Sequence, residues 1–152
     1  ITEEHLAAVR IKNLLVNLNN TTASIDSKLN AYCFTLINDK HDLPVYMAES
    51  ILRTKDNIFV YNLGANLPVD DFIVASKKNP PHIIFVSIVY VENIDAVREE
   101  VHSLLDHFRD KDVSIFLSGN GLSQLEIKRD NFTPINSYRM FEDLIESRIN
   151  KE

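Results

Sequence analysis

The chain of 152 residues is 45% hydrophobic and 25% charged, which fits one globular domain with its own core and excludes a disordered or fibrous protein. Lys and Arg number 16 against 22 Asp and Glu, so the net charge is −6, and no basic run offsets it, which argues against direct nucleic-acid binding by this segment. Only 3 glycines are present, so the glycine-rich loops that bind dinucleotides or nucleotide phosphates are excluded.

Cysteine use and hydropathy indicate the compartment. The single cysteine, Cys33, lies in an apolar run and cannot form a disulfide framework, so a reducing, cytoplasmic location is expected. No apolar stretch approaches the roughly 20 residues of a membrane span, so no membrane partner is expected.

The N-terminal segment, residues 1–20, is predicted to form a helix, because its apolar residues recur near helical spacing. A polar linker is expected at 21–30. From residue 31 to 152, short apolar runs alternate with amphipathic stretches, which indicates a βα array with a parallel sheet. The first helix is surplus to that array, so we expect it to belong to another part of a longer protein, of which this chain is a segment.

The alternating region contains five predicted βα units. The predicted strands are 31–37, 58–63, 83–89, 113–117 and 132–136. The predicted helices are 44–55, 69–78, 94–108, a short one ending near 129, and 138–149. The run at 83–89 is almost continuously apolar, as expected for a central strand buried on both faces. This pattern predicts an α/β, flavodoxin-like, doubly wound sheet in the order 2-1-3-4-5, with its ligand crevice at the carboxyl ends of strands one, three and four.

Three loops border that crevice: 38–44, 87–91 and 118–121. In the first loop Asp39 stands two residues before His41, so its carboxylate can hold one ring nitrogen and leave the other free to ligate a metal. Ser87 reaches the same edge from the third strand, within range of a hydrogen bond to Asp39. An Asp-x-His pair in a polar loop is commonly just solvated, and its place in the crevice is what favours a site.

Each crevice loop carries one short motif: Asp39-x-His41-x-x-Pro44, Ser87-x-Val89 and Ser118-Gly119. Together they resemble the cobalamin-binding Rossmann-like domain, whose pattern at these loops is Asp-x-His-x-x-Gly, Ser-x-Leu and Gly-Gly. The resemblance covers about residues 31–150. The first helix, with Glu4 and His5, is similar to the last bundle helix of the light-sensing MerR-type regulators that bind adenosylcobalamin.

The resemblance implies a cobalamin cofactor, adenosylcobalamin or another form, bound with its own base displaced. His41 would be the lower axial ligand and so the metal ligand, and Asp39 and Ser87 would form a relay behind it. Glu4 and His5 would face the adenosyl side. The other implied cofactor-binding positions are Pro44, Val89, Ser118 and Gly119.

The same resemblance implies a role in transcription regulation and no enzymatic activity. The chain would be the ligand-sensing and oligomerisation domain of a MerR-family regulator, with light or the cobalamin level as its signal. It would form a homo-oligomer and contact DNA only through a separate N-terminal domain that is not in this chain.

Two positions depart from the family pattern, because Pro44 and Ser118 stand where the family has glycine. The resemblance implies that the displaced nucleotide tail passes there, and both side chains occupy space that it needs. Three functions therefore stay open: the sensor, a corrinoid carrier for a methyltransferase, and a degenerate domain that binds no corrin and serves for dimerisation or another ligand.

No catalytic residue is predicted. His82, His102 and His107 are spaced too widely for a metal pair on one helix face and are expected near the surface. A phosphoreceiver domain needs an aspartate at the end of the third strand, where this chain has Ser87 and apolar residues.

Overall fold

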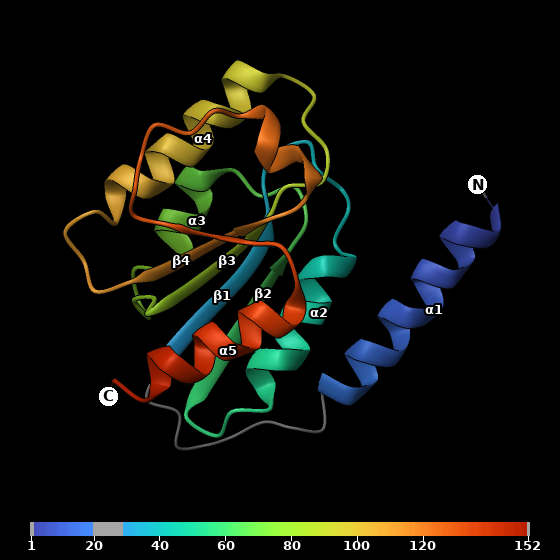
Figure 1. Cartoon of the computed structure of the whole chain (residues 1–152). Helices are drawn as coiled ribbons and strands as arrows, with labels where there is room; N and C mark the ends of the chain where they lie inside the picture. The colour runs from blue at the N-terminus through green and yellow to red at the C-terminus, as the bar shows by residue number, and fades with distance from the viewer. Residues whose placement is uncertain (1, 20–28, 152) are drawn as a thin grey trace.

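The structure is a computed structural model that describes residues 2–19 and 29–151. The described residues form a five-stranded parallel sheet in the order β2-β1-β3-β4-β5 (Figure 1), which confirms the predicted flavodoxin-like fold. The strands are β1 (Leu29–Thr35), β2 (Ile58–Gly64), β3 (Ile83–Ser87), β4 (Ser114–Ser118) and β5 (Thr133–Ile135). The helices are α1 (Thr2–Asn19), α2 (Leu43–Arg53), α3 (Val69–Ala75), α4 (Ile94–His107), the 3-10 helix η1 (Asn120–Gln124) and α5 (Tyr138–Ile149).

Helices cover both faces of the sheet, with α2 and α5 on one side and α3 and α4 on the other (Figure 1). On the first face Val45 and Phe141 belong to an apolar cluster with Phe85 of β3. On the second face Phe72 and Leu104 belong to another. All residues of β3 are buried, as its apolar run predicts for a central strand.

Most element boundaries differ from the prediction by one to three residues, and three of the differences have a clear structural cause. Strand β3 is two residues shorter, because the N–H groups of Val89 and Tyr90 donate to the Asp39 side chain instead of continuing the sheet. Strand β1 begins two residues earlier, since the buried Leu29 pairs with β2. The helix expected to end near 129 is only the short η1, and Glu126 beyond it has φ 48°, which no helix continues through.

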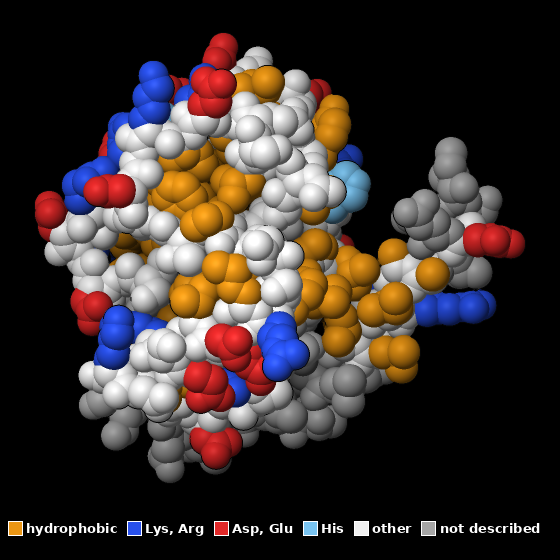
Figure 2. Space-filling view, in the orientation of Figure 1, with side chains coloured by type: hydrophobic (Ala, Val, Ile, Leu, Met, Phe, Trp, Pro, Cys, Tyr) orange, Lys and Arg blue, Asp and Glu red, His pale blue; other side chains and the backbone are white. Residues whose placement is uncertain are grey.

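Helix α1 lies outside the three layers, beside α2 (Figure 1). The Lys12 ammonium donates to Asp42 Oδ2 at 2.6 Å and lies 5.0 Å from the centre of the Tyr46 ring, and the hydrogen bond raises the pKa of Lys12. Hydrophobic side chains gather along α1 in Figure 2, and Leu14 is 64% exposed. Of the predicted linker, 21–28 lies outside the described residues and the last two residues belong to β1. None of the described helices is long and apolar enough to cross a membrane.

Tyr32 links β1 to the segment before β3. Its ring is 2% exposed and stacks on Tyr61 with centroids 4.6 Å apart, and its hydroxyl donates to the carbonyl of Asn79 at 2.7 Å. Tyr32→Phe removes that donor and leaves a carbonyl without its partner, so we expect a loss of about 1 kcal/mol in the free energy of unfolding, measured by urea denaturation.

Tyr61→Phe is the matched control, because it removes a hydroxyl from the ring that stacks on Tyr32. We expect it to lower the free energy of unfolding by less than Tyr32→Phe does. Equal losses in the two variants would contradict the role of the Tyr32 hydroxyl.

Burial raises the pKa of Tyr32 from 10.0 to about 12. Since the folded state disfavours the phenolate, stability is complete below pH 10 and falls as the pH rises toward 12. Tyr32→Phe should flatten that fall.

Candidate functional site

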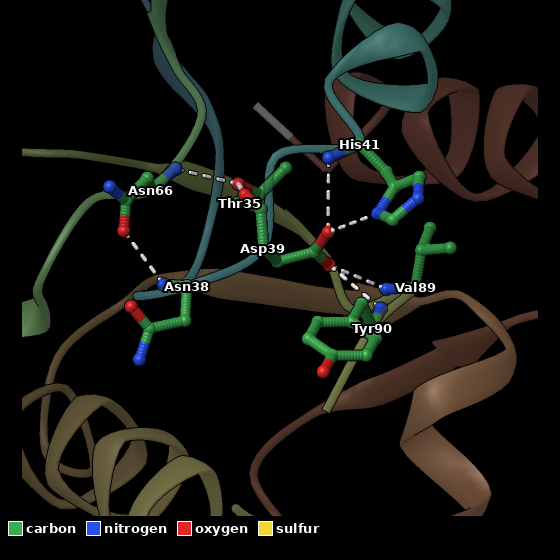
Figure 3. Close-up of polar contacts among 7 residues, drawn as sticks. All are labelled: Thr35, Asn38, Asp39, His41, Asn66, Val89 and Tyr90. Atoms are coloured by element: carbon green, nitrogen blue, oxygen red, sulfur yellow. Dashed lines mark hydrogen bonds and ion pairs between the residues drawn. The ribbon is translucent and has the colours of Figure 1, made fainter. Parts of the chain in front are cut away.

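The loop after β1 is held against the loop after β2 at the carboxyl edge of the sheet. Asn38 and Asn66 both have left-handed backbone, with φ 67° and 58°, a region that Asn enters more readily than most residues. The Asn38 N–H donates to Asn66 Oδ1 at 2.7 Å, and the Asn66 N–H donates to Thr35 Oγ1 at 2.9 Å (Figure 3). The Thr35 hydroxyl donates to the backbone carbonyl of Asp39. These three hydrogen bonds hold the loop that carries Asp39.

The Asp39 carboxylate is the centre of the site. It is 1% exposed, yet it accepts four hydrogen bonds. Oδ1 accepts the backbone N–H of His41 at 3.0 Å and lies 2.9 Å from its ring Nδ1. Oδ2 accepts the N–H groups of Val89 at 2.7 Å and Tyr90 at 3.1 Å (Figure 3). One buried side chain thus joins the loops after β1 and β3, and its charge is balanced by donors from both.

The His41 ring is fixed on one side and open on the other. In the neutral ring, Nδ1–H donates to Asp39 Oδ1, which leaves the lone pair of Nε2 free. The side chain is 59% exposed, and in Figure 3 the ring extends away from Asp39. The Tyr90 ring stands beside it, with centroids 6.4 Å apart. The arrangement offers a single oriented imidazole nitrogen to a ligand, as the sequence predicts for the Asp-x-His pair.

Ser87 lies at the same edge but does not form the hydrogen bond to Asp39 that the sequence predicts. Its hydroxyl oxygen is buried and has no hydrogen-bond partner among the described residues. Backbone N–H groups take its place on Oδ2, because the loop after β3 turns Val89 and Tyr90 toward the carboxylate. Sequence reasoning missed the part played by Tyr90, and its position directly after the Ser-x-Val motif was the available signal.

A cavity of about 240 Å³ lies beside Ser87 at this edge. It brings together five predicted positions from three loops: Pro44, Ser87, Val89, Ser118 and Gly119. Pro44 and Ser118, which stand where the resembled family has glycine, are both half-buried and form part of the wall of this cavity. The opposite wall is the segment 135–138, and burial raises the pKa of Tyr138 there, so its phenol stays protonated.

Gly119 fixes how the loop after β4 approaches the loop after β3. Its φ is 105°, and a Cβ placed on it would lie 2.2 Å from the carbonyl oxygen of Ile88. That oxygen accepts the N–H of Gly121 at 2.9 Å, and the Ile88 N–H donates to the carbonyl of Ser118 at 2.7 Å. Only glycine permits this close contact of two backbones.

Glu4 and His5, which the resemblance implies face the adenosyl side of the cofactor, are on α1. Their side chains are not among those that the structure describes. Helix α1 contacts this edge through the ion pair of Lys12 with Asp42, the residue that follows His41 in the chain. Among residues 2–19 and 29–151, no group of three or more His, Cys, Asp or Glu side chains is placed to hold a metal ion. A metal ion at this edge would therefore need coordinating atoms from a bound cofactor in addition to His41.

Comparisons with solved structures show what the fold is similar to. A cobalamin-binding protein from Desulfitobacterium hafniense is 20% identical, with a TM-score of 0.57 over 81% of this chain and 60% of that one. A methanol:cobalamin methyltransferase complex from Methanosarcina barkeri is 16% identical, with a TM-score of 0.65 over 88% of this chain and 51% of that one. The monomethylamine corrinoid protein of the same organism is 16% identical, with a TM-score of 0.61 over 88% and 63%.

At these identities the likeness shows the fold, which is that of cobalamin-binding domains. This chain spans between 51% and 63% of the length of those proteins. Comparison with protein-family models and with curated proteins finds no match.

Proposed function

We propose that this domain binds a corrinoid, with Nε2 of His41 as the lower axial ligand to cobalt. The observation that carries the proposal is the exposed His41 ring, whose other nitrogen is held at 2.9 Å by a carboxylate that is itself buried and fully hydrogen-bonded. A ligating histidine typically has such a partner on its second nitrogen, since this bond orients the ring and raises its basicity.

The donor set fits a corrinoid better than a bare metal ion. A corrin ring supplies the four equatorial nitrogens of cobalt, so a protein has to add only an axial ligand. At this edge of the sheet one oriented imidazole is present, and the described residues contain no cluster that could coordinate an ion alone. Asp39 keeps that imidazole in the tautomer whose Nε2 lone pair faces the ligand.

The cavity beside Ser87 fits part of a ligand. Its volume of about 240 Å³ is below the ~300–1,000 Å³ of pockets that hold a whole drug-sized molecule, so it suits a fragment such as a displaced nucleotide tail. The buried Ser87 hydroxyl has no hydrogen-bond partner in the described part of the chain and would pair with a polar atom of that fragment. Pro44 and Ser118 line this same cavity, at the positions where the resembled family has glycine.

For the biological role we propose the sensor: a homo-oligomeric, non-enzymatic domain of a MerR-type regulator that responds to light or to the cobalamin level and reaches DNA through a separate domain. The placement of α1 beside the His41 loop, joined by the ion pair of Lys12 and Asp42, supports it. The carrier for a methyltransferase is the second candidate, favoured by the likeness to a corrinoid protein and a cobalamin methyltransferase complex.

Corrinoid binding is tested by mixing the protein with adenosylcobalamin in the dark, followed by gel filtration and a visible spectrum. We expect co-elution at a ratio of about one to one and a spectrum with histidine in place of the cofactor's own base. His41→Ala should weaken binding about tenfold or more and abolish that spectrum. His102→Ala, a histidine away from this edge, is the matched control. Absence of bound corrinoid, or an unchanged spectrum in His41→Ala, would refute the proposal.

The role is tested on the corrinoid-loaded protein by size-exclusion chromatography before and after illumination. A sensor should change its oligomeric state, because the signal has to reach a partner domain. An unchanged state under light, and also with and without cobalamin, would contradict the sensor and favour the carrier.

A further inference from the structure

A second cavity opens at the amino-terminal edge of the sheet, the edge opposite His41. Its volume is about 570 Å³, within the ~300–1,000 Å³ typical of small-molecule pockets. It is bordered by the end of α3, by the prolines and His82 that precede β3, and by the segment between α4 and β4. Ile73, Pro81, Phe108 and Val113 give it apolar walls. An apolar body of one or two rings would find suitable contacts there.

Two lysines, Lys77 and Lys111, line this cavity in a protein whose net charge is −6. In the described part of the chain, neither ammonium lies within ion-pair distance of a carboxylate. Asp112 also lines the cavity, but both of its oxygens accept from Arg148, each at 3.1 Å. The acidic side chain that lines this cavity is therefore paired with Arg148 rather than with either lysine.

The ammonium of Lys111 contacts uncharged groups instead. It lies 3.1 Å from Nε2 of His107 and 5.1 Å from the centre of the Phe108 ring. Lysines near helix ends commonly interact with the last carbonyl groups, whereas this ammonium is held at the cavity wall by an imidazole and a ring. Burial, and after it the charges of Lys111 and Lys77, lowers the pKa of His107, so this imidazole is neutral at pH 7.

His82 adds a donor to the same cavity. Its Nδ1 accepts the backbone N–H of Asn30 at 3.0 Å, so in the neutral ring the proton is on Nε2. The cavity lining therefore combines apolar walls with two ammonium groups and an imidazole N–H, and these donors favour an acceptor with negative charge.

We propose that this cavity binds a small organic anion with a compact apolar body, such as an aromatic carboxylate, with Lys77 and Lys111 holding its charge. The apolar body lies against Phe108, Pro81 and Val113, and the carboxylate pairs with the ammonium groups of Lys77 and Lys111, which are both exposed. This site is independent of the proposed corrinoid site, because the two lie at opposite edges of the sheet and share no lining residue.

The test is isothermal titration calorimetry with 1-naphthoate and with naphthalene-1-carboxamide, which has the same apolar body without the charge. We expect saturable binding of naphthoate to one site and at least about tenfold weaker binding of the carboxamide. Saturation should also raise the pKa of His107, followed by NMR of its ring protons, because an anion opposes the charges of Lys77 and Lys111. This NMR signal places the ligand in the cavity.

The variant Lys77→Gln/Lys111→Gln should lose about tenfold or more in naphthoate affinity, whereas Lys128→Gln, an exposed lysine outside the cavity, should not. The comparison of acid and amide on the unmodified protein stands even if the double variant folds poorly. Absence of saturable binding, equal affinity for acid and amide, or an unchanged His107 pKa would overturn the proposal.

Discussion

Gly119→Ala is expected to destabilise the protein by about 3 kcal/mol or more, because the substitution strains the backbone and forces two segments apart. The new Cβ would lie 2.2 Å from the oxygen and 2.6 Å from the carbon of the Ile88 carbonyl. Backbone atoms cannot turn aside as a flexible side chain can. The φ of 105° at this position adds strain for any residue with a Cβ.

The same substitution should impair the corrinoid site. Ile88 directly precedes Val89 and Tyr90, whose N–H groups are held by Asp39, so a shift of Ile88 disturbs the carboxylate that orients His41. We therefore expect Gly119→Ala to bind corrinoid more weakly even under conditions where it is folded, as measured by gel filtration with adenosylcobalamin.

Gly64→Ala is the matched control. Gly64 also has positive φ, at 76°, but a Cβ there meets no atom within 4 Å. Its cost should be only that of the left-handed conformation, about 1–2 kcal/mol. Urea denaturation of both variants separates the two causes. If Gly64→Ala lost as much stability as Gly119→Ala, the contact with Ile88 would not be the reason.

Asp39→Asn should lower the free energy of unfolding by about 2–4 kcal/mol, and the His41 ring should lose the carboxylate that orients it. All four of its partners are donors when the His41 ring is neutral with its proton on Nδ1. An amide keeps the size of the side chain but presents its NH₂ group to one pair of donors, so those groups lose their acceptor in a buried place. The His41 ring, no longer fixed by a carboxylate, should bind corrinoid about tenfold or more weakly.

Asp42→Asn is the control for a nearby carboxylate, since Asp42 is partly exposed and pairs with Lys12. Loss of such a pair is worth about 0–1 kcal/mol. Both variants are measured by urea denaturation and by titration with adenosylcobalamin. A variant Asp39→Asn with normal stability and normal corrinoid affinity would show that the buried carboxylate does not organise this edge.

Much of the fold follows from local patterns. The alternation of apolar runs with amphipathic helices predicts the strand order, and the continuous apolar run before Ser87 predicts the buried central strand, as the structure has it. The contact of Asp39 with His41 is likewise predictable, because two residues in one tight loop can be paired from their spacing alone. These inferences need only neighbours in the chain.

The remaining features depend on contacts between distant segments. Nothing in the sequence around Ser87 reveals that Asp39, about 50 residues earlier, accepts from the backbone of Val89 and Tyr90 and shortens β3. Every residue except proline has a backbone N–H, so the sequence does not indicate which of them donates to Asp39. The sequence pattern therefore assigns the hydrogen bond to the Ser87 side chain. The meeting of Pro44 and Ser118 at one cavity wall is likewise set by helix and strand placement, which the sequence pattern does not contain.

The composition and periodicity of this chain thus determined its α/β fold class, its strand order and the pairing of Asp39 with His41. These three features depend on short-range spacing and on which face of each element is apolar. Tertiary structure alone decided the partners of the buried carboxylate, the burial of the Ser87 hydroxyl away from any partner within 2–19 and 29–151, and the lysine-lined cavity at the opposite edge. These features arise where loops far apart in the chain meet, and their geometry is set by packing of the whole sheet.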